Sequence, residues 1–172
     1  LGPGARHGLH DEETTLAEVF KSKGYATAIF GKWHLGHLPE FLPTRHGFDE
    51  FAGIPYSNDM WPFHPESPDA WVDLPTFDQE EIVGYNTDQS RFTTDFTNRG
   101  VDFIQRSADA GQPFFLYLPH PMPHVPLFVS DERAGASGAG LFGDVIHEID
   151  WSVGQILKAL DDAGLADNTL VI

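Results

Sequence analysis

The sequence Gly31-Lys32-Trp33-His34-Leu35-Gly36 follows directly after an apolar run, Tyr25-Ala26-Thr27-Ala28-Ile29-Phe30. A short, continuous apolar run of this kind predicts a buried strand. Lys32 and His34 would then lie where the strand ends, and in open α/β sheets ligands bind at the carboxyl ends of strands. The two flanking glycines allow the backbone to turn sharply and to approach a ligand closely. The segment is a candidate ligand site, the alternative being a solvated lysine beside a histidine at the edge of the core.

A second strand pattern ends in histidines in the same way. Residues 113–118, Pro-Phe-Phe-Leu-Tyr-Leu, predict a second fully buried strand. It runs straight into residues 119–126, Pro-His-Pro-Met-Pro-His-Val-Pro. The prolines around His120 and His124 restrict the backbone, which suits side chains that must be held in place. Both predicted strands therefore deliver basic groups to a carboxyl end.

Helical patterns alternate with these strands. Thr15-Leu16-Ala17-Glu18 fits the capping box that begins a helix, and Gly24 ends this helix just before the first strand. Further helices are expected over residues 92–108 and 141–163, and the chain finishes with an apolar run over 169–172 that predicts the start of a third buried strand. Helices alternating with buried strands predict the α/β class.

The predicted helix over residues 141–163 has an apolar stripe and several acidic residues. The stripe consists of Val145, Ile149, Val153, Ile156, Leu157 and Leu160. The acidic residues fall mostly off this stripe, so we expect them on a solvated face and not as ligands. They are Asp144, Glu148, Asp150, Asp161 and Asp162.

Residues 37–89 show no regular periodicity and are rich in proline and aromatic residues. Their many large apolar side chains argue against disorder, so we expect ordered irregular structure packed over the sheet edge. Within it, Ser57, Asn58 and Asp59 place polar groups beside the apolar string Gly53-Ile54-Pro55-Tyr56. The alternative for this short polar stretch is an ordinary turn.

Composition narrows the possible functions. The 172 residues amount to one domain or a piece of a larger one, and the apolar start at Leu1 and apolar end at Ile172 suggest cut ends. A formal charge of −16 argues against nucleic acid as a partner, and no apolar run is long enough to span a membrane. With no cysteine, these residues contain no disulfide, thiolate metal site or cysteine nucleophile.

Lys32, His34, His120 and His124 together would line a crevice suited to an anionic, tetrahedral substrate such as a sulfate or phosphate ester. A lysine supplies a point charge for the oxygens, and a histidine can donate a hydrogen bond or protonate a leaving group near neutral pH. Ser57 could add a neutral donor. The sequence has no glycine-rich phosphate loop, no zinc-binding helix motif and no nucleophile elbow. No convincing cluster of Asp and Asn oxygens predicts a calcium or magnesium site.

The string Gly31-Lys32-Trp33-His34-Leu35-Gly36 resembles a signature of the sulfatases, which belong to the alkaline phosphatase superfamily. The resemblance covers nearly the whole chain and is weakest around residues 62–90. The Ile54-Pro55-Tyr56-Ser57 string makes the arylsulfatase A-like branch the nearest resemblance. Further matching stretches are residues 43–51, 53–59, 113–117, 122–126 and 148–172.

The resemblance implies a role for each candidate residue. Lys32 would bind the sulfate and the oxygens of the nucleophile, and His34 would hydrogen-bond the hydroxyl of that nucleophile. Ser57 would line the sulfate pocket. His124 would contact the sulfate and protonate the leaving alcohol, while His120 is a less specific match and is assigned to the pocket wall.

The resemblance also implies parts that these residues lack. The family uses a formylglycine nucleophile and a Ca²⁺ ion, whose motif and ligands would lie outside residues 1–172. We therefore expect residues 1–172 to be part of a single sulfatase catalytic domain, without its nucleophile segment and its C-terminal part, and to show no turnover alone. The expected fold is a fragment of an alkaline phosphatase-like domain, a mixed or parallel sheet sandwiched by helices.

Several readings remain open. The substrate would be a small sulfate ester or a sulfated glycan, with residues 60–90 as the candidate specificity region. The resemblance suggests a periplasmic or secreted protein. One alternative is a phosphodiesterase or phosphonate hydrolase of the same superfamily, although the Lys-Trp-His string favours sulfate. The other is a non-catalytic, anion-binding scaffold.

Overall fold

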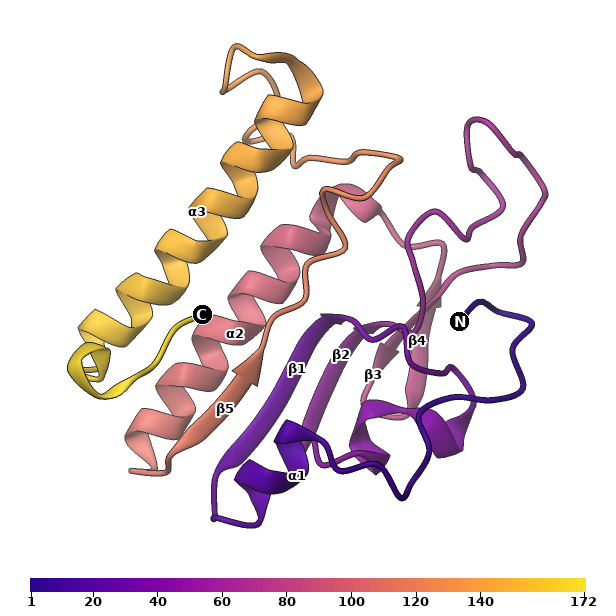
Figure 1. The fold of residues 1–172 in the computed structure, drawn as a ribbon. Helices are drawn as coiled ribbons and strands as arrows, with labels where there is room; N and C mark the ends of the chain where they lie inside the picture. Colours follow the sequence, from indigo (N-terminus) through magenta and orange to yellow (C-terminus); the bar gives the residue numbers. More distant parts are fainter.

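A five-stranded mixed sheet forms the centre of the computed structural model, which describes all of residues 1–172 (Figure 1). The strand order is β4-β3-β2-β1-β5; β1 pairs in parallel with β2 and β5, and β3 is antiparallel to β2 and β4. The strands are β1 (Ala26–Lys32), β2 (Glu50–Ile54), β3 (Pro75–Asp78), β4 (Glu81–Tyr85) and β5 (Phe114–Tyr117). The helices are α1 (Leu16–Lys21), α2 (Phe92–Asp109) and α3 (Gly140–Asp162), with short 3₁₀ turns between elements.

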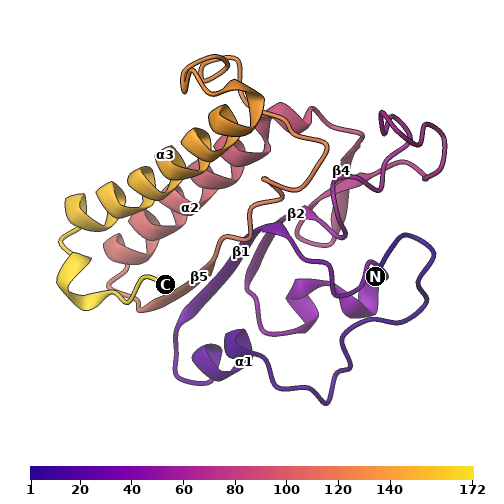
Figure 2. The same cartoon turned by 45° about the horizontal axis from the view of Figure 1, so that its top comes forward.

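Strand β1 is buried on both faces, which explains its continuous apolar sequence. Successive side chains of a strand point to opposite faces of the sheet. Ala28 and Phe30 therefore pack with Phe103 of α2 on one face, and Ile29 packs with Ala17 of α1 on the other. The sheet lies between α2 on one side and α1 on the other, so the expected α/β class and helix-covered sheet are confirmed (Figures 1 and 2).

Helix α3 packs along α2 as an outer layer (Figure 2). A methyl group on Gly100 of α2 would lie 3.0 Å from Ile156 Cδ1 of α3, so the glycine permits a close approach of the two helices. Buried hydroxyl groups join them, since Thr97 Oγ1 lies 2.6 Å from Ser152 Oγ. No helix in the protein is both long and apolar enough to cross a membrane.

The interpretation of residues 37–89 as irregular is wrong in part, because β2, β3 and β4 lie within them. Strand β2 contains Gly53, where a Cβ atom would lie 1.8 Å from the carbonyl oxygen of Gly31 in β1. The close approach requires glycine, and a glycine weakens the sequence pattern of a strand. Strand β4 is largely exposed, so it lacks an apolar alternation altogether.

Two expectations for the C-terminal part are also wrong. Residues 169–172 form no strand in this structure, and Leu170 to Ile172 are exposed. Two of the acidic residues assigned to a solvated face of α3, Asp144 and Glu148, are buried. The reason is that α3 faces its neighbours with polar groups: Asp144 accepts hydrogen bonds from Gly135 N and Ser137 N, and Glu148 lies beside Arg133. Part of the predicted apolar stripe, Val153 and Leu157, is correspondingly half exposed.

Candidate active site

The segments that follow three parallel strands meet at the carboxyl edge of the sheet. After β1, the Trp33 and His34 amides donate to the carbonyl oxygens of Ile54, the last residue of β2, and Pro55, which follows it, each at 3.0 Å. On the other side of β1, the Lys32 amide donates to the carbonyl oxygen of Pro119, just beyond β5, at 2.9 Å. The edge where ligands bind in α/β sheets thus carries the residues singled out in the sequence.

His34 lies in electrostatic range of the other charged groups of this edge. Its backbone adopts a left-handed conformation with φ of 63°, which is uncommon for a non-glycine residue and occurs at functional sites. Burial lowers the pKa of His34, and the positive charges of the chain's amino terminus, Lys32 and His124 lower it further, while Asp59 opposes them. The imidazole is therefore mainly neutral at pH 7.

Ser57 lies in the loop after β2. Its neighbours in this loop are fixed on both sides, because Pro55 accepts a hydrogen bond from the His34 amide and Asn58 donates one to Pro126, beyond β5. Ser57 is 2% exposed, and its hydroxyl group has no hydrogen-bond partner within the protein. Asn58 Oδ1 and Asp59 Oδ1 are also buried without a partner. Buried polar atoms are nearly always satisfied, so three unpartnered atoms in one tripeptide indicate a place where a polar ligand or water binds.

His124 is exposed at the mouth of this edge. Its Nδ1 atom lies 2.6 Å from the carbonyl oxygen of Val125. A carbonyl oxygen only accepts hydrogen bonds, so Nδ1 carries the proton and Nε2 is left for a ligand. The flanking Pro123 and Pro126 restrict the backbone around it.

His120 is oriented differently from the other three candidates. Its Nε2 atom lies 3.0 Å from Ser152 Oγ of α3, and burial lowers its pKa to about 4. The ring therefore packs against the helix layer and stays neutral at pH 7. Its assignment to the substrate pocket stays a prediction without support from these contacts.

The structure brings Lys32, His34, Ser57 and His124 to one edge of the sheet, while their individual roles stay predictions. The edge combines a lysine charge, a neutral imidazole, a buried hydroxyl group and a histidine with a free ring nitrogen. Such a set can bind an oxyanion and transfer a proton to an oxygen atom beside it.

The sequence analysis missed Gln89, which lies in the 3₁₀ turn Gln89–Arg91 at the start of α2. Gln89 is 3% exposed, and its amide group exchanges hydrogen bonds with Asn58. The two residues are 31 positions apart, so no local pattern could have paired them. It also missed His46, which is 1% exposed and stacks on Trp33 at 6.0 Å between ring centroids.

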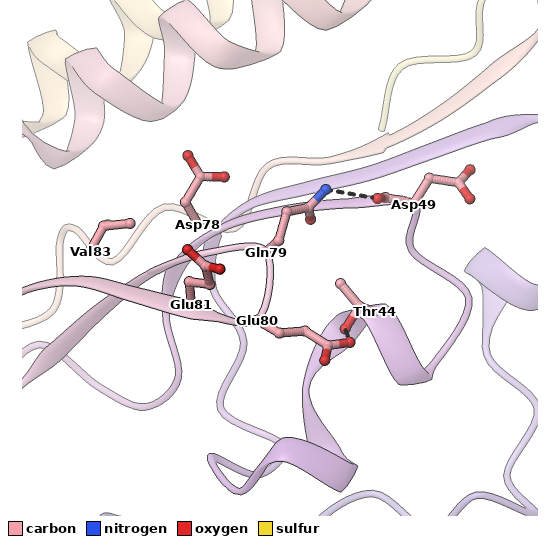
Figure 3. Close-up of a pocket in the computed structure, with 7 residues that line it drawn as sticks. All are labelled: Thr44, Asp49, Asp78, Gln79, Glu80, Glu81 and Val83. Atoms are coloured by element: carbon pink, nitrogen blue, oxygen red, sulfur yellow. Dashed lines mark hydrogen bonds between the residues drawn. The ribbon is translucent and has the colours of Figure 1, made fainter.

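The opposite, amino edge of the parallel strands holds a shallow acidic depression (Figure 3). Figure 3 shows its carboxylates on the loop before β2 and on the β3–β4 turn. Three of them form ion pairs with basic side chains, which is typical of a solvated surface network. The pairs are Asp49 with Lys21 at 2.6 Å, Asp78 with Arg99 at 2.6 Å and Glu80 with Arg45 at 2.7 Å.

The residues present do not fit a calcium site by themselves. Ca²⁺ takes six to eight oxygen ligands. No group of three or more His, Asp or Glu side chains in residues 1–172 could hold a metal ion. Residues 1–172 therefore do not form a complete Ca²⁺ site from their own carboxylates and histidines.

Comparisons with known proteins identify the family of the chain. The chain is 39% identical over 170 residues to human N-acetylgalactosamine-6-sulfatase, covering 95% of this chain and 32% of that protein. It is 38% identical over 185 residues to bovine arylsulfatase A, covering 99% of this chain and 36% of that protein. The chain thus spans about a third of the length of these curated relatives.

A solved structure shows the same fold. The PsFucS1 sulfatase from Pseudoalteromonas sp. superposes with a TM-score of 0.78 at 22% identity, over 96% of this chain and 38% of that one. A sequence model of the Sulfatase family matches residues 2–172. With this match and the two relatives, the family is established: the chain belongs to the sulfatases.

Proposed function

We propose that residues 1–172 form part of a single catalytic domain whose protein hydrolyses sulfate esters, as arylsulfatases do. The observation that carries the proposal is the meeting of Lys32, His34, Ser57 and His124 at the carboxyl edge, in a chain of the sulfatase family. The formylglycine nucleophile and the Ca²⁺ ion would be supplied by residues outside these 172.

Each residue has a task that its surroundings support. Lys32 holds the non-bridging oxygens of the sulfate by its charge, and the Ser57 hydroxyl group donates one hydrogen bond to them. The neutral His34 imidazole accepts a hydrogen bond from the hydroxyl group of the nucleophile. When the sulfur–oxygen ester bond breaks, protonated His124 gives the Nε2 proton to the departing alcohol oxygen.

The test is hydrolysis by the full-length protein encoded by the gene, compared on matched esters. We expect 4-nitrophenyl sulfate to be hydrolysed faster than bis(4-nitrophenyl) phosphate and 4-nitrophenyl phosphonate esters. A preference for either phosphorus ester would favour the alternative hydrolase of the superfamily. Sulfate binding by the folded chain with no turnover of any ester would favour the non-catalytic scaffold.

We further propose a sulfated sugar as substrate, supported by the similarity to an N-acetylgalactosamine-6-sulfatase. The loop of residues 60–74 follows β2 and exposes the aromatic side chains of Phe63 and Trp71. Exposed aromatic faces suit stacking on a sugar ring. Replacing Trp71 with Ala should raise the KM for a sulfated monosaccharide but not for an aryl sulfate, and equal effects on both would contradict the role.

The same loop refines the predicted specificity region. Of residues 60–90, the β3–β4 turn lies at the amino edge, away from the candidate site (Figure 3), and residues 60–74 are our candidate for the part that contacts a substrate. The resemblance to exported sulfatases is the basis for proposing a periplasmic or secreted protein. Detection of the activity in the culture medium or the periplasmic fraction, as opposed to the cytosol, tests that location.

A further inference from the structure

Asn58 joins three segments that surround the candidate site. Its side chain is fully buried, and its Nδ2 atom donates to Gln89 Oε1 at 3.1 Å and to the carbonyl oxygen of Pro126 at 3.2 Å. Gln89 Nε2 donates in return to the carbonyl oxygen of Asn58 at 3.0 Å. One carboxamide thus connects the loop after β2, the start of α2 and the loop after β5.

The Pro126 contact matters because this residue lies two positions after His124. The loop that carries His124 is anchored on its other side by Met122, which is 3% exposed and accepts a hydrogen bond from the Phe128 amide at 3.4 Å. The His124 side chain forms its hydrogen bond within its own loop, with the carbonyl oxygen of Val125. The position of His124 relative to Ser57 therefore depends on the backbone of this loop, and the Asn58–Pro126 hydrogen bond joins the two loops beside the packing of Trp61 on Phe128.

We propose that Asn58 is a positioning residue, which fixes His124 relative to Ser57, Lys32 and His34 at the carboxyl edge; its catalytic significance rests on the proposed sulfatase function. A misplacement of about 1 Å in a catalytic group costs on the order of 100-fold in rate. A donor that is rigid on both sides is suited to prevent such a misplacement. Leucine at this position would fill the same space and remove both donated hydrogen bonds.

The first test measures the loop itself, by amide hydrogen exchange in the full-length protein that contains these residues. In Asn58→Leu we expect exchange of the His124 and Phe128 amides to accelerate about fivefold, since one hydrogen bond contributes about 1 kcal/mol. The amides of β1 should exchange at the wild-type rate. Gln105→Leu is the control, because Gln105 makes one hydrogen bond to Asp109 on the exposed side of α2.

A second variant, Gln89→Met, allows the same measurement if Asn58→Leu does not fold. Gln89→Met removes the partner that holds the Asn58 carboxamide and leaves Asn58 itself in place. It should accelerate exchange of the same two amides, by a smaller factor. Unchanged exchange at His124 and Phe128 in every folded variant would overturn the proposal.

The second test measures how strongly His124 changes the pKa of His34, an effect that depends on the distance between the two rings. The pKa is followed by NMR titration of the His34 ring. In the wild type, His124→Ala should raise the pKa of His34, because the charge of His124 lowers it. In the Asn58→Leu background the same substitution should have less effect, since the two rings no longer keep their spacing. An equal effect in both backgrounds would contradict a positioning role.

The third test uses the full-length enzyme. Asn58→Leu should lower kcat about 10- to 100-fold with little change in KM, while Gln105→Leu leaves both unchanged. If the protein proves to hydrolyse no sulfate ester, the exchange and titration results still decide whether Asn58 positions the loop. Normal kcat together with accelerated exchange would limit Asn58 to a structural role and overturn the positioning of His124 for catalysis.

Discussion

The two edges of the parallel strands differ in how their polar groups are satisfied. At the carboxyl edge, Ser57, Asn58 and Asp59 each keep a buried atom without a partner, and Lys32 forms no ion pair. At the amino edge, three of the four carboxylates in the depression of Figure 3 are paired with basic side chains. Most of the charges in the acidic depression are therefore already compensated.

This difference indicates that a ligand binds at the carboxyl edge. An unsatisfied buried polar atom costs about 1–3 kcal/mol, so a fold retains several in one loop only where something else completes them. An exposed ion pair contributes about 0–1 kcal/mol and its loss is easily tolerated. The unpaired groups of the carboxyl edge therefore indicate binding, and the paired groups of the amino edge indicate solubility.

The largest expected effect is a loss of stability when a buried carboxylate with all its partners, Glu148, is replaced. Glu148 is 1% exposed, lies 3.6 Å from Arg133 and accepts hydrogen bonds from the Ser130 amide. Glu148→Ala should lower the free energy of unfolding by about 3–5 kcal/mol, because it leaves a mostly buried guanidinium group unpaired. Urea unfolding monitored by circular dichroism measures this loss.

The double substitution Glu148→Gln with Arg133→Met is the control for that prediction. It removes both charges and keeps the packing, so it should cost less than Glu148→Ala alone. A loss below about 1 kcal/mol for Glu148→Ala would place this pair with the exposed ones and weaken the comparison.

Replacing one lysine at each edge tests whether only the carboxyl edge takes part in the reaction. Lys32 lies at the carboxyl edge, and Lys21 pairs with Asp49 at the amino edge. In the full-length enzyme, Lys32→Ala should lower kcat/KM for a sulfate ester about 100- to 1,000-fold, the usual loss of one charge-stabilising contact in a transition state. Lys21→Ala should leave kcat/KM unchanged. Similar activity of the two variants would break the distinction between the edges.

These elements also show how far the sequence could predict the molecule. The strand over residues 25–30 and its Lys32 and His34 were predictable, because β1 is buried on both faces and reads as an uninterrupted apolar run. His124 was predictable because it follows the apolar run of β5, although this strand is only partly buried and not fully buried as expected. Local patterns were sufficient wherever the core decided the sequence.

The remainder depended on contacts between distant residues. Asp144 and Glu148 occupy helical positions that a period of 3.6 assigns to solvent. The loop of residues 130–140 folds back onto α3 and bonds both of them, and Thr94 of α2 donates to Glu148. Strand β2 was hidden by Gly53, which the close approach to β1 requires. The Asn58–Gln89 pair joins two loops, and loops carry no periodicity from which a partner could be found.

His120 provides a pH-dependent test of the helix layer behind the carboxyl edge. Its pKa is about 4 in the folded protein and 6.5 ordinarily, so the unfolded chain binds the additional proton between these values. Stability is therefore full above pH 6.5 and falls as the pH drops, by about 2 kcal/mol at pH 5. Urea unfolding at pH 7 and pH 5 measures the difference, and His120→Asn should reduce it by that amount.

Three other histidines also contribute to the pH dependence of stability. Burial also lowers the pKa of His34, His37 and His46, so some loss of stability at pH 5 should persist in the His120→Asn variant. The decisive quantity is the change in pH dependence between variant and wild type. An identical pH dependence would mean that His120 has the same pKa in the folded and unfolded states, which would contradict a buried ring packed against α3.

The smallest expected effect lies at the amino edge. Glu80 accepts hydrogen bonds from Arg45 and Thr44 at the surface of the acidic depression (Figure 3). Glu80→Gln should change the free energy of unfolding by less than about 1 kcal/mol, since both partners of the ion pair are exposed to water. It should also leave kcat/KM for a sulfate ester unchanged. A marked loss of activity without loss of stability would contradict this comparison. It would mean that a ligand bound in the acidic depression contributes to the reaction.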